Sequence, residues 1–544
     1  SSRQGPPRTT DHRVTSPINT RVLTAIRAAP EAVRGIRRGI EKESLRVTPT
    51  GELALTPHPT GLGSALTHPY ITTDFSEAQL ELITGIHDSA DACIDALVDI
   101  HRFVYQHLDD DELLWTTSMP CMLADGDDIP IGRYGSSHIG RAKSIYRMGL
   151  GNRYGRLMQT ISGIHYNFSV PDDLWPVIAA ARGKEPTARF KTDAYFDLIR
   201  NFRRHGWLLI YLFGASPAVC RSFVRGLDHD LEDFDEGSAY LPHATSLRMG
   251  RLGYQSDAQS SLYVSYNSLE RYAETMVEAL TRPYPPYEAI GVRVNGEYQQ
   301  LNTALLQIEN EFYGTIRPKR RVHSGERPLE ALMSRGVEYV EVRCLDLNPF
   351  LRVGIDPAAI RFIDAFLLHC LVCESPLDDE ATSDAMQANQ LATVRAGRSP
   401  QTTLREGGRD RPLAEWARAL VDEVMPIAAV IDAVTGTDEH AFSVETQRNK
   451  IDDPDQTPSA RVLEAMRSQR LPFFRFALQQ AAAHKGYFDE HPLRPGVLAH
   501  FDQVRDQSVE DQRAAEAAVT GSFEEFLVDY LSLDLGETSR EDSI

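Results

Sequence analysis

The chain has 544 residues, 42% hydrophobic and 25% charged, so it is long and apolar enough to bury a large core. Its formal net charge of -20 argues against nucleic acid and anionic membrane surfaces as partners, because both would repel it. No segment approaches the roughly 18 consecutive apolar residues of a membrane span, and the start at Ser1 is polar, without an apolar signal core. We therefore expect a cytoplasmic enzyme, and we expect it to be a monomer.

The first part of the chain predicts both helices and strands. Residues 1–17 are polar, and we expect a flexible tail there. Residues 19–29 have helical spacing, whereas 35–47 (GIRRGIEKESLRV) alternate with a period of two, as a strand does. Helical spacing returns over 91–114. Residues 158–170 (MQTISGIHYNFSV) predict another strand, because they are rich in β-branched and aromatic residues.

The second part predicts more helix than strand. Helical spacing covers 193–212, residues 337–345 (VEYVEVRCL) predict a strand, and 358–373 predict an apolar helix in the core. Residues 376–412 carry Asp, Ser, Thr, Gly and Pro with few large apolar residues, so we expect a long loop region. The predicted units are a tail (1–17), a core (18–375), a loop-rich connection (376–412) and a helix-rich C-terminal part packing on the core (413–544).

The cysteines are scattered, which is typical of reduced thiols in a cytosolic protein. Only Cys370 and Cys373 share a short spacing, within the apolar run FIDAFLLHCLVC. Because no second ligand pair accompanies them, we expect them to pack in the core rather than to bind metal. The six positions are Cys93, Cys121, Cys220, Cys344, Cys370 and Cys373.

Several strand-like segments place acids and other potential ligands on one face. Glu41 and Glu43 alternate in this way, and a single such pair is more typical of a solvated surface. These segments, however, also contain Ile, Leu, Val, Tyr and Phe typical of a buried sheet, so several carboxylates would be desolvated together. The other alternating sets are Glu77 with Glu81, His165 with Asn167, Glu309 with Glu311 and Tyr313, and Glu341 with Arg343.

A buried group of carboxylates needs protons or cations. Two like charges about 4 Å apart repel by roughly 4 kcal/mol at an effective dielectric constant near 20. Oxygen ligands with one imidazole favour Mg²⁺ or Mn²⁺ over zinc, and such ions most often hold phosphates. Arg343 and the run 316–321 (IRPKRR) offer cations for a transferring phosphoryl group, although the run is equally typical of a solvated basic turn.

At these residues the sequence resembles a known family, the glutamate-cysteine ligases of the proteobacterial type. The resemblance runs through GIRRGIEKESLRV at 35–47, MQTISGIHYNF at 158–168 and the EVR of 341–343. It thins beyond residue 376, although 452–455 and 459–461 still match. The other motifs are 63–68, 71–75, 118–121, 152–155, 211–217, 244–248, 252–254, 306–311 and 316–320.

The resemblance implies an α+β fold related to glutamine synthetase and the guanidino kinases, in which a curved, mainly antiparallel sheet forms a funnel surrounded by helices. It also implies three sets of site residues. The metal ligands or their near neighbours would be Glu41, Glu43, Asp74, Glu81, His165 and Glu341. The cysteine pocket would comprise Phe75, Leu150, Tyr254 and Tyr313, with Arg248 taking the carboxylate. ATP would be contacted by Arg343, Lys319 and Arg317.

The implied reaction is phosphoryl transfer followed by acyl substitution. ATP would phosphorylate the γ-carboxylate of glutamate, with Glu341 and Arg343 in the catalytic centre and magnesium bound. The amine of cysteine would then attack the γ-glutamyl phosphate, giving γ-glutamylcysteine, the precursor of glutathione. Feedback inhibition by glutathione is a further expectation from the family.

Two alternatives remain open. Met148 departs from the family pattern where an acid is expected, so the chain could instead be a γ-glutamyl ligase with another small amine or amino acid as acceptor. It could also be a catalytically inactive relative that kept the scaffold. Such a protein should have lost an acid, His165 or Arg343, and all of them are present.

Overall fold

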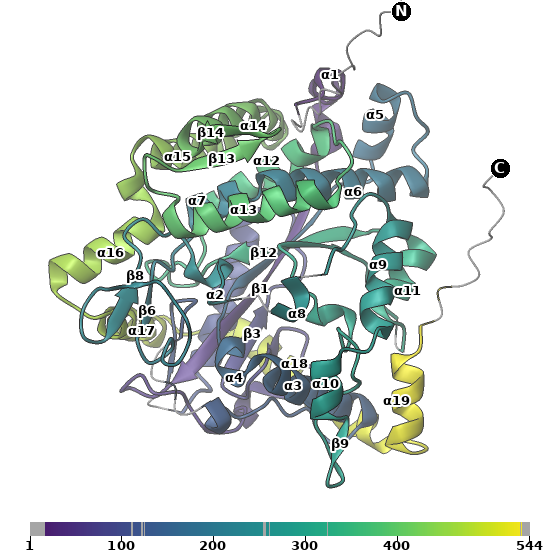
Figure 1. Ribbon diagram of the computed structural model, residues 1–544, viewed down its shortest axis with the longest axis vertical. Coiled ribbons are helices and arrows are strands. Elements are labelled where there is room, and N and C mark those ends of the chain that lie inside the picture. Colours follow the sequence, from purple (N-terminus) through teal and green to yellow (C-terminus); the bar gives the residue numbers. More distant parts are fainter. Residues whose placement is uncertain are drawn as a thin grey trace, which may run out of the picture.

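The computed structural model describes residues 17–109, 112–120, 123, 126–253, 257–260, 262–323, 325–533 and 535. Its centre is a seven-stranded sheet in the order β11-β12-β5-β1-β3-β2, with β4 paired to β1, and helices surround it (Figure 1). Every pairing in this sheet is antiparallel. The strands are β1 (Arg37–Val47), β2 (Ile71–Thr73), β3 (Gln79–Ile83), β4 (Leu113–Leu114), β5 (Ile164–Ser169), β11 (Ile316–Lys319) and β12 (Tyr339–Leu345). The α+β fold with a mainly antiparallel sheet is confirmed.

The helices fall into two groups along the chain. Those up to the last strand of the sheet are α1 (Thr20–Ala28), α2 (Ala90–Tyr105), α3 (His138–Tyr154), α4 (Arg156–Gln159), α5 (Leu174–Ala181), α6 (Ala188–His205), α7 (Trp207–Phe213), α8 (Asp257–Ser260), α9 (Leu269–Thr281), α10 (Pro285–Ile290) and α11 (Pro328–Arg335). Those after it are α12 (Pro357–Val372), α13 (Glu380–Ala396), α14 (Leu413–Thr435), α15 (Glu439–Asp452), α16 (Pro458–Gln469), α17 (Phe473–Glu490), α18 (Pro495–Ala517) and α19 (Phe523–Leu531).

Three small sheets lie outside the central one. They comprise β6 (Ala218–Cys220), β7 (Glu232–Asp233) and β8 (Ser238–Tyr240); β9 (Arg293–Val294) and β10 (Glu297–Tyr298); and β13 (Thr403–Glu406) and β14 (Arg409–Pro412).

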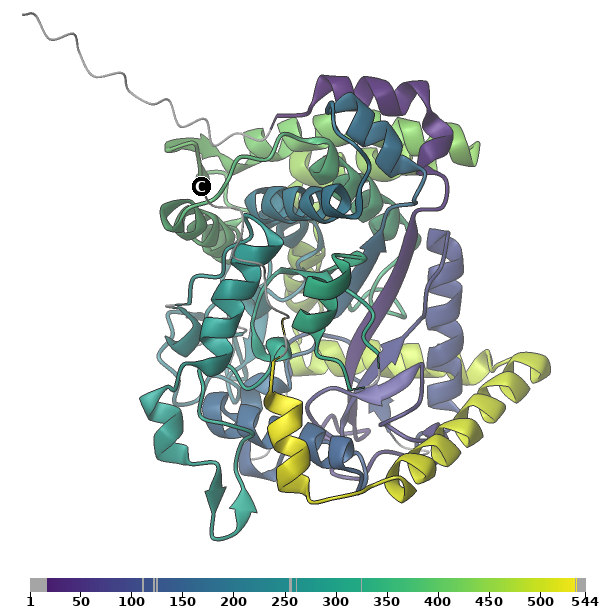
Figure 2. The same ribbon diagram turned by 90° about the vertical axis from the view of Figure 1, so that its right-hand side faces the viewer.

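One face of the central sheet packs against helices. Alternation along β1 turns Ile40 and Lys42 toward this face, where Lys42 Nζ lies 2.7 Å from His101 Nε2 of α2. On β5, the Tyr166 hydroxyl donates to Asp364 Oδ1 of α12 at 2.6 Å. Figure 2 shows α2 running beside β1. The opposite face of the sheet is therefore the one left for a site.

Some element boundaries differ from the sequence prediction. The helix expected over 91–114 ends at Tyr105 and is followed by β4, and the strand expected over 158–170 begins only at Ile164 because α4 precedes it. Glu309–Glu311 form a 3-10 turn rather than a strand, so their predicted alternation was wrong.

The prediction of a loop region at 376–412 was also wrong. It contains α13, capped by the Asp379 side chain, and the hairpin β13–β14. Helix α13 is built from Ala, Thr, Gln and Asn with few large apolar residues, and it buries only the small set Asn389, Thr393 and Val394. Its composition therefore gave little hydrophobic signal, although the segment is ordered by tertiary contacts.

The cysteines are only partly as expected. Cys93, Cys344, Cys370 and Cys373 are free and buried, whereas Cys220 is disulfide-bonded, which corrects the prediction of reduced thiols throughout. Cys121 lies outside the described residues.

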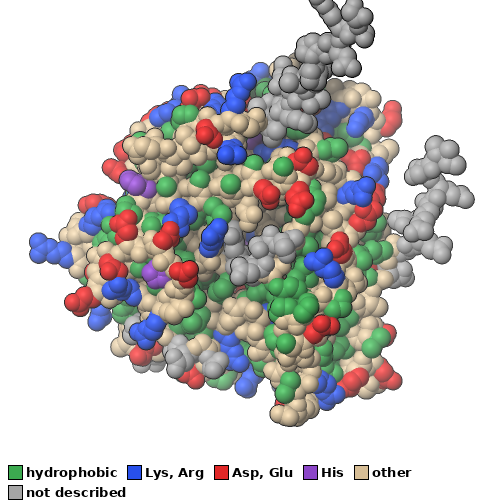
Figure 3. All heavy atoms as spheres, in the orientation of Figure 1, with side chains coloured by type: hydrophobic (Ala, Val, Ile, Leu, Met, Phe, Trp, Pro, Cys, Tyr) green, Lys and Arg blue, Asp and Glu red, His purple; other side chains and the backbone are tan. Residues whose placement is uncertain are grey.

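Two surface properties bear on partners. Among the described helices, none combines the length and apolarity needed to cross a membrane. On the face in Figure 3, acidic and basic side chains are interspersed rather than collected into a basic stripe. That face does not resemble the electrostatic footprint of a nucleic-acid-binding protein.

Candidate active site

Strand register brings acids from two strands and a histidine from a third together on the face opposite the helices. Glu41 of β1 lies opposite His165 of β5, and Glu43 lies opposite Glu81 of β3. Residues directly opposite in an antiparallel pair point to the same side, as do residues two apart on one strand. We call Glu41, Glu43, Glu81 and His165 the carboxylate cluster. The pair predicted from β1 alone is therefore the centre of a larger group.

The carboxylate cluster is compact and largely buried. His165 Nδ1 lies 3.3 Å from Glu41 Oε2, and His165 Nε2 lies 3.7 Å from Glu43 Oε1. Ligand atoms of Glu41, Glu81 and His165 all lie within 4.8 Å of one another. Asn167 Nδ2 donates to Glu41 Oε1 at 2.9 Å, and the Gly163 amide donates to Glu43 Oε2 at 2.7 Å.

Two of the three acids of the cluster, Glu43 and Glu81, are poorly neutralised by the protein. Burial, followed by the charge of Asp74, raises the pKa of Glu43 to about 8. Burial and the charge of Glu41 raise the pKa of Glu81 well above its usual range. Burial is the largest influence on Glu41 and opposes its ionisation, but the hydrogen bond to His165 together with the charges of His165 and Lys319 lowers the pKa of that carboxyl overall. Asp74 follows β2 directly and acts electrostatically on both Glu43 and Glu81, as expected of a cluster neighbour.

Glu341 lies beside the cluster but is paired with cations. Its carboxylate is 2.7 Å from Lys319 Nζ and 2.6 Å from Arg343 Nη1. Despite burial, these cations hold the pKa of Glu341 well below its usual range. Arg317 lies nearby on β11, where its guanidinium donates to the carbonyls of Asn310 and Phe312. Arg343 and Lys319 thus face the acids directly, whereas Arg317 holds the adjoining turn.

The other predicted acids do not join the cluster. Glu309 pairs with Arg327 at 2.6 Å, and Glu311 pairs with Arg153 at 2.9 Å. Glu77 accepts two hydrogen bonds from backbone amides. These carboxylates are satisfied by the fold itself, so the contacts indicate a structural role.

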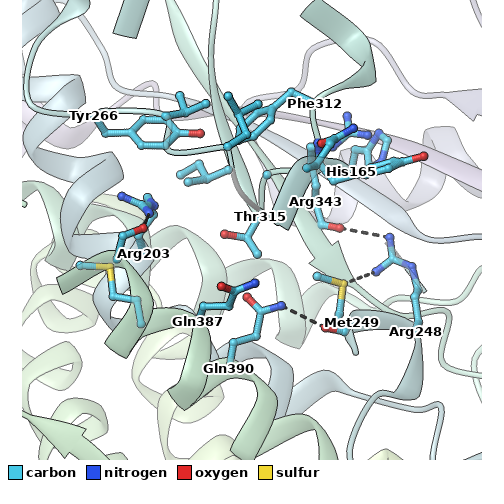
Figure 4. A pocket seen from close by; sticks show the side chains of 18 residues that line it. His165, Arg203, Arg248, Met249, Tyr266, Phe312, Thr315, Arg343, Gln387 and Gln390 are labelled. Carbon is cyan, nitrogen blue, oxygen red and sulfur yellow. Dashed lines mark hydrogen bonds between the residues drawn. The ribbon is translucent and has the colours of Figure 1, made fainter. Parts of the chain in front are cut away.

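A cavity of about 200 Å³ opens beside the cluster and is lined by charged, amide and aromatic side chains (Figure 4). His165 and Arg343 lie at one end of it with Arg248, and Tyr266 and Arg203 lie at the other. The lining residues are His165, Arg203, Arg248, Met249, Gln259, Leu262, Val264, Tyr266, Phe312, Tyr313, Gly314, Thr315, Ile316, Arg343, Ser383, Met386, Gln387 and Gln390.

Arg248 is fully buried at the edge of this cavity. Its Nη2 donates to the Arg343 carbonyl at 3.1 Å, and its Nη1 lies 3.7 Å from Asp346 Oδ1. The guanidinium also packs over Gly163, where an added Cβ would come within 1.9 Å of Nη2. Gly163 therefore has two roles: its amide donates a hydrogen bond to Glu43, and its lack of a side chain leaves space for the Arg248 guanidinium.

The predicted cysteine pocket is partly assembled in the structure. Tyr313 lines the cavity with Arg248, and its ring packs edge-on against Tyr154 at 5.7 Å. Tyr154 in turn packs against the apolar cluster that contains Phe75 and Leu150. These two side chains thus stand behind the cavity rather than in its lining. Tyr254 lies outside the described residues.

Sequence reasoning missed the wall formed by α6 and α13. Arg203 comes from α6, and four residues come from α13, the segment predicted as loop. Ser383, Met386, Gln387 and Gln390 have the i, i+3, i+4, i+7 spacing of one helix face. That spacing is the signal that could have revealed the helix and its orientation.

The donor set fits a hard divalent cation. The cluster offers carboxylate oxygens and one imidazole and no thiolate, which favours Mg²⁺ or Mn²⁺. The raised pKa values of Glu43 and Glu81 indicate negative charge that the protein does not itself compensate. Asp74 acts electrostatically on Glu43 and Glu81, and Glu341 acts on Glu41, so both acids lie in the neighbourhood of the cluster.

Known proteins resemble most of the chain. The family model described as glutamate-cysteine ligase matches residues 23–393. The chain is 49% identical over 508 residues to a glutamate–cysteine ligase of Alcanivorax borkumensis, which covers 92% of this chain and 97% of that protein. It is 51% identical over 504 residues to the enzyme of that name from Pseudomonas aeruginosa, covering 92% and 95%.

Solved structures agree with the sequence comparison. A crystal structure of glutamate–cysteine ligase from Francisella tularensis in complex with AMP superposes with a TM-score of 0.86 and 38% identity, covering 91% of this chain and 97% of that chain. A bifunctional glutathione synthetase from Pasteurella multocida superposes with a TM-score of 0.70 and 25% identity, covering 90% and 58%. The chain belongs to the glutamate-cysteine ligase family.

Proposed function

We propose that this chain joins the γ-carboxylate of L-glutamate to the amine of L-cysteine, converting ATP to ADP and phosphate and giving γ-glutamylcysteine. The observation that carries the proposal is the carboxylate cluster, which lies beside Arg343 and a cavity that Arg248 also lines. Phosphoryl transfer needs acids that hold metal ions and basic side chains that bind the phosphates, and this site offers both. The identity of the substrates follows from membership of the glutamate-cysteine ligase family.

Arg343 and Lys319 are the proposed phosphate-binding cations. Both approach Glu341 within 2.7 Å or less, so each is held in place before substrate arrives. A guanidinium can contact two oxygens of a phosphoryl group at once, which suits Arg343 to steady the group in transfer. Arg317 would contact ATP in the same region, where it also holds the 310–312 turn.

The proposed Mg²⁺ ligands are the carboxylate cluster with Asp74 and Glu341, and Mn²⁺ could replace Mg²⁺. When bound, the ions neutralise the phosphates and the charge that develops during transfer. His165 has a pKa lowered by burial and by Arg343, so its neutral imidazole is available as a ligand. Asn167 orients Glu41 through its donated hydrogen bond.

Arg248 is proposed to take the carboxylate of cysteine. Its burial and its contacts with Asp346 and the Arg343 carbonyl fix the guanidinium in one orientation. Tyr313 would contact the thiol-bearing side chain, backed by Phe75 and Leu150, and Tyr254 is proposed as a further wall. The amine of cysteine then attacks the γ-glutamyl phosphate from this pocket, with water excluded.

The alternative acceptor has little support. Met148, the position that departs from the family pattern, lies on α3, where its Sδ is 4.0 Å from Arg156 Nη2 of α4, and it is not among the residues lining the cavity. Cysteine and a near-isostere such as 2-aminobutyrate would still be separated only modestly by an apolar pocket. Inhibition by glutathione and a monomeric state stay predictions.

The test is phosphate release from MgATP by the purified chain. With glutamate and cysteine present we expect steady release and formation of γ-glutamylcysteine, and a panel of other amines should be slower. Chelation of divalent metal should stop the reaction, and added Mg²⁺ should restore it. Phosphate release that is independent of glutamate, or fastest with another amine, would contradict the proposed reaction.

A further inference from the structure

A second group of potential metal ligands lies on the helical side of the molecule. His369 and Cys373 stand one turn apart at the C-terminal end of α12, and Glu423 reaches them from α14. His369 Nε2 lies 3.0 Å from Glu423 Oε2 and 3.3 Å from Cys373 Sγ. Ligand atoms of all three residues lie within 4.8 Å of one another.

These distances suit a tetrahedral cation of intermediate softness. Zinc binds thiolate at about 2.3 Å and imidazole or carboxylate at about 2.0–2.2 Å, so neighbouring ligand atoms are separated by roughly 3.3–3.6 Å. The two distances found here are slightly shorter, and small side-chain rotations would open them. A thiolate, an imidazole and a carboxylate together select zinc over magnesium, in contrast to the carboxylate cluster.

The surroundings favour a dication over separate charges. The side chain of His369 is fully buried and Cys373 is completely inaccessible, whereas that of Glu423 is 39% exposed. A thiolate and a carboxylate with Zn²⁺ sum to zero charge, so the filled site avoids an unpaired charge in the interior. Exposure at Glu423 leaves room for a water molecule as the fourth ligand.

His205, one of the titratable neighbours of these residues, adds no positive charge. His205 of α6 has its ring 6.3 Å from that of His369, and its Nδ1 has no hydrogen-bond partner among the described residues. Burial, then the proximity of His369, hold the pKa of His205 well below its usual range, so this imidazole is neutral. A second buried, uncharged imidazole therefore stands beside the three ligands.

We propose that His369, Cys373 and Glu423 form a structural zinc site that fastens α14 to α12. The position is a junction of distant segments, because Cys373 also forms a β-bridge with Ile18. Zinc would thus hold the C-terminal helices and the start of the described chain onto the core. The spacing of Cys370 and Cys373 had indicated core packing alone, because the third ligand lies 50 residues beyond Cys373 in the sequence.

The test uses cobalt as a spectroscopic substitute for zinc. The full chain is stripped of metal, then titrated with Co²⁺ in excess Mg²⁺, which occupies the carboxylate cluster. We expect one Co²⁺ per chain with a thiolate-to-cobalt charge-transfer band and the visible bands of tetrahedral cobalt, all removed by added Zn²⁺. Zinc should also raise the thermal unfolding midpoint, as any ligand specific to the folded state does.

Two variants and a matched control make the test specific. Cys373→Ser should lose the charge-transfer band and weaken zinc binding by more than about 100-fold, beyond the 10–100-fold typical of outer-shell partners. Cys370→Ser, a buried cysteine on the same helix, should keep both. Glu423→Gln changes a partly exposed side chain, so it should fold normally and still bind zinc more weakly.

The outcomes separate clearly. Absence of the charge-transfer band in the wild-type chain, or its persistence in Cys373→Ser, would overturn the site. Unchanged zinc affinity in Glu423→Gln would remove that residue from the ligand set and overturn the proposed link to α14. None of these readouts depends on ligase activity.

Discussion

The two faces of β1 carry buried charge in opposite ways. On the helical face, Arg38 pairs with Asp364 at 2.8 Å, and Tyr166 donates to the same carboxylate. On the cavity face, Glu43 and Glu81 lie opposite each other, and burial together with neighbouring acids raises the pKa values of both. The neutralised pair of Arg38 and Asp364 therefore indicates a structural role, whereas the raised pKa values of Glu43 and Glu81 indicate a functional one.

Lys42 strengthens this contrast. It lies between Glu41 and Glu43 in sequence, yet alternation turns it to the helical face, where it contacts His101 rather than an acid. Burial lowers the pKa of Lys42 to about 7. On the helical face, burial thus favours the neutral form of Lys42, which has no acid as its hydrogen-bond partner among the described residues. On the cavity face, several acids lie close to one another.

The largest expected effect comes from removing an acid on the cavity face. Glu41→Gln or Glu341→Gln should lower kcat by about 10³-fold, because several kcal/mol of charge stabilisation in phosphoryl transfer would be lost. Phosphate release measured over a wide range of Mg²⁺ concentrations checks this. The exposed substitution Glu232→Gln is the control. Near-normal turnover in both Glu41→Gln and Glu341→Gln would show that these acids do not hold the metal.

Replacing an acid on the helical face by its amide should lower stability rather than kcat. Asp364→Asn leaves Arg38 buried without its partner charge, and we expect a loss of about 3–5 kcal/mol in the free energy of unfolding. Urea denaturation measures it, and the folded fraction should keep its kcat. Glu31→Gln, which breaks the exposed pair with Arg34, should change stability by less than about 1 kcal/mol. A large loss of kcat with unchanged stability in Asp364→Asn would contradict a purely structural role for the helical face.

A carboxyl-to-amide change at Glu43 should increase the stability of the fold, whereas the change at Asp364 should decrease it. In metal-free protein, Glu43→Gln should raise the free energy of unfolding by about 1–3 kcal/mol, since it removes a buried charge near Asp74 and Glu81. Because the folded-state pKa is raised to about 8, the wild-type carboxyl is favourable below its unfolded pKa and loses that advantage as pH rises toward 8. The gain in the variant should therefore grow between pH 5 and about 8. A variant less stable than wild type at pH 8 would contradict the interpretation.

The smallest predicted effect comes from Gly163, which lies between Glu43 of the carboxylate cluster and Arg248 of the proposed cysteine pocket. Gly163→Ala places a Cβ against Arg248, so the guanidinium must shift. We expect KM for cysteine to rise about 10-fold or more, equivalent to at least about 1.4 kcal/mol, with a smaller change in KM for ATP. Gly486→Ala, whose Cβ would meet nothing within 4 Å, is the matched control. Equal changes for both substrates would indicate a general disturbance of β5.

The sequence by itself determined the alternation of β1, the helices α1, α6 and α12, and the chemical type of the carboxylate cluster. These follow from local periodicity and from residue types whose chemistry does not depend on the fold. The ordered motifs also sufficed to identify the family, which the comparisons confirm.

Only the tertiary structure decided which acids work together. Glu41, Glu81 and Glu341 meet because β3 and β5 pair with β1 while β12 pairs with β5. Glu309 and Glu311 have equally suggestive spacing but are neutralised by Arg327 and Arg153. The same holds for Glu423 beside Cys373, and for α13, whose small polar residues form a cavity wall only because neighbours order them. Local spacing sets the direction of a side chain, but its partners come from segments tens to hundreds of residues away, and their distances depend on packing that no short window of sequence contains.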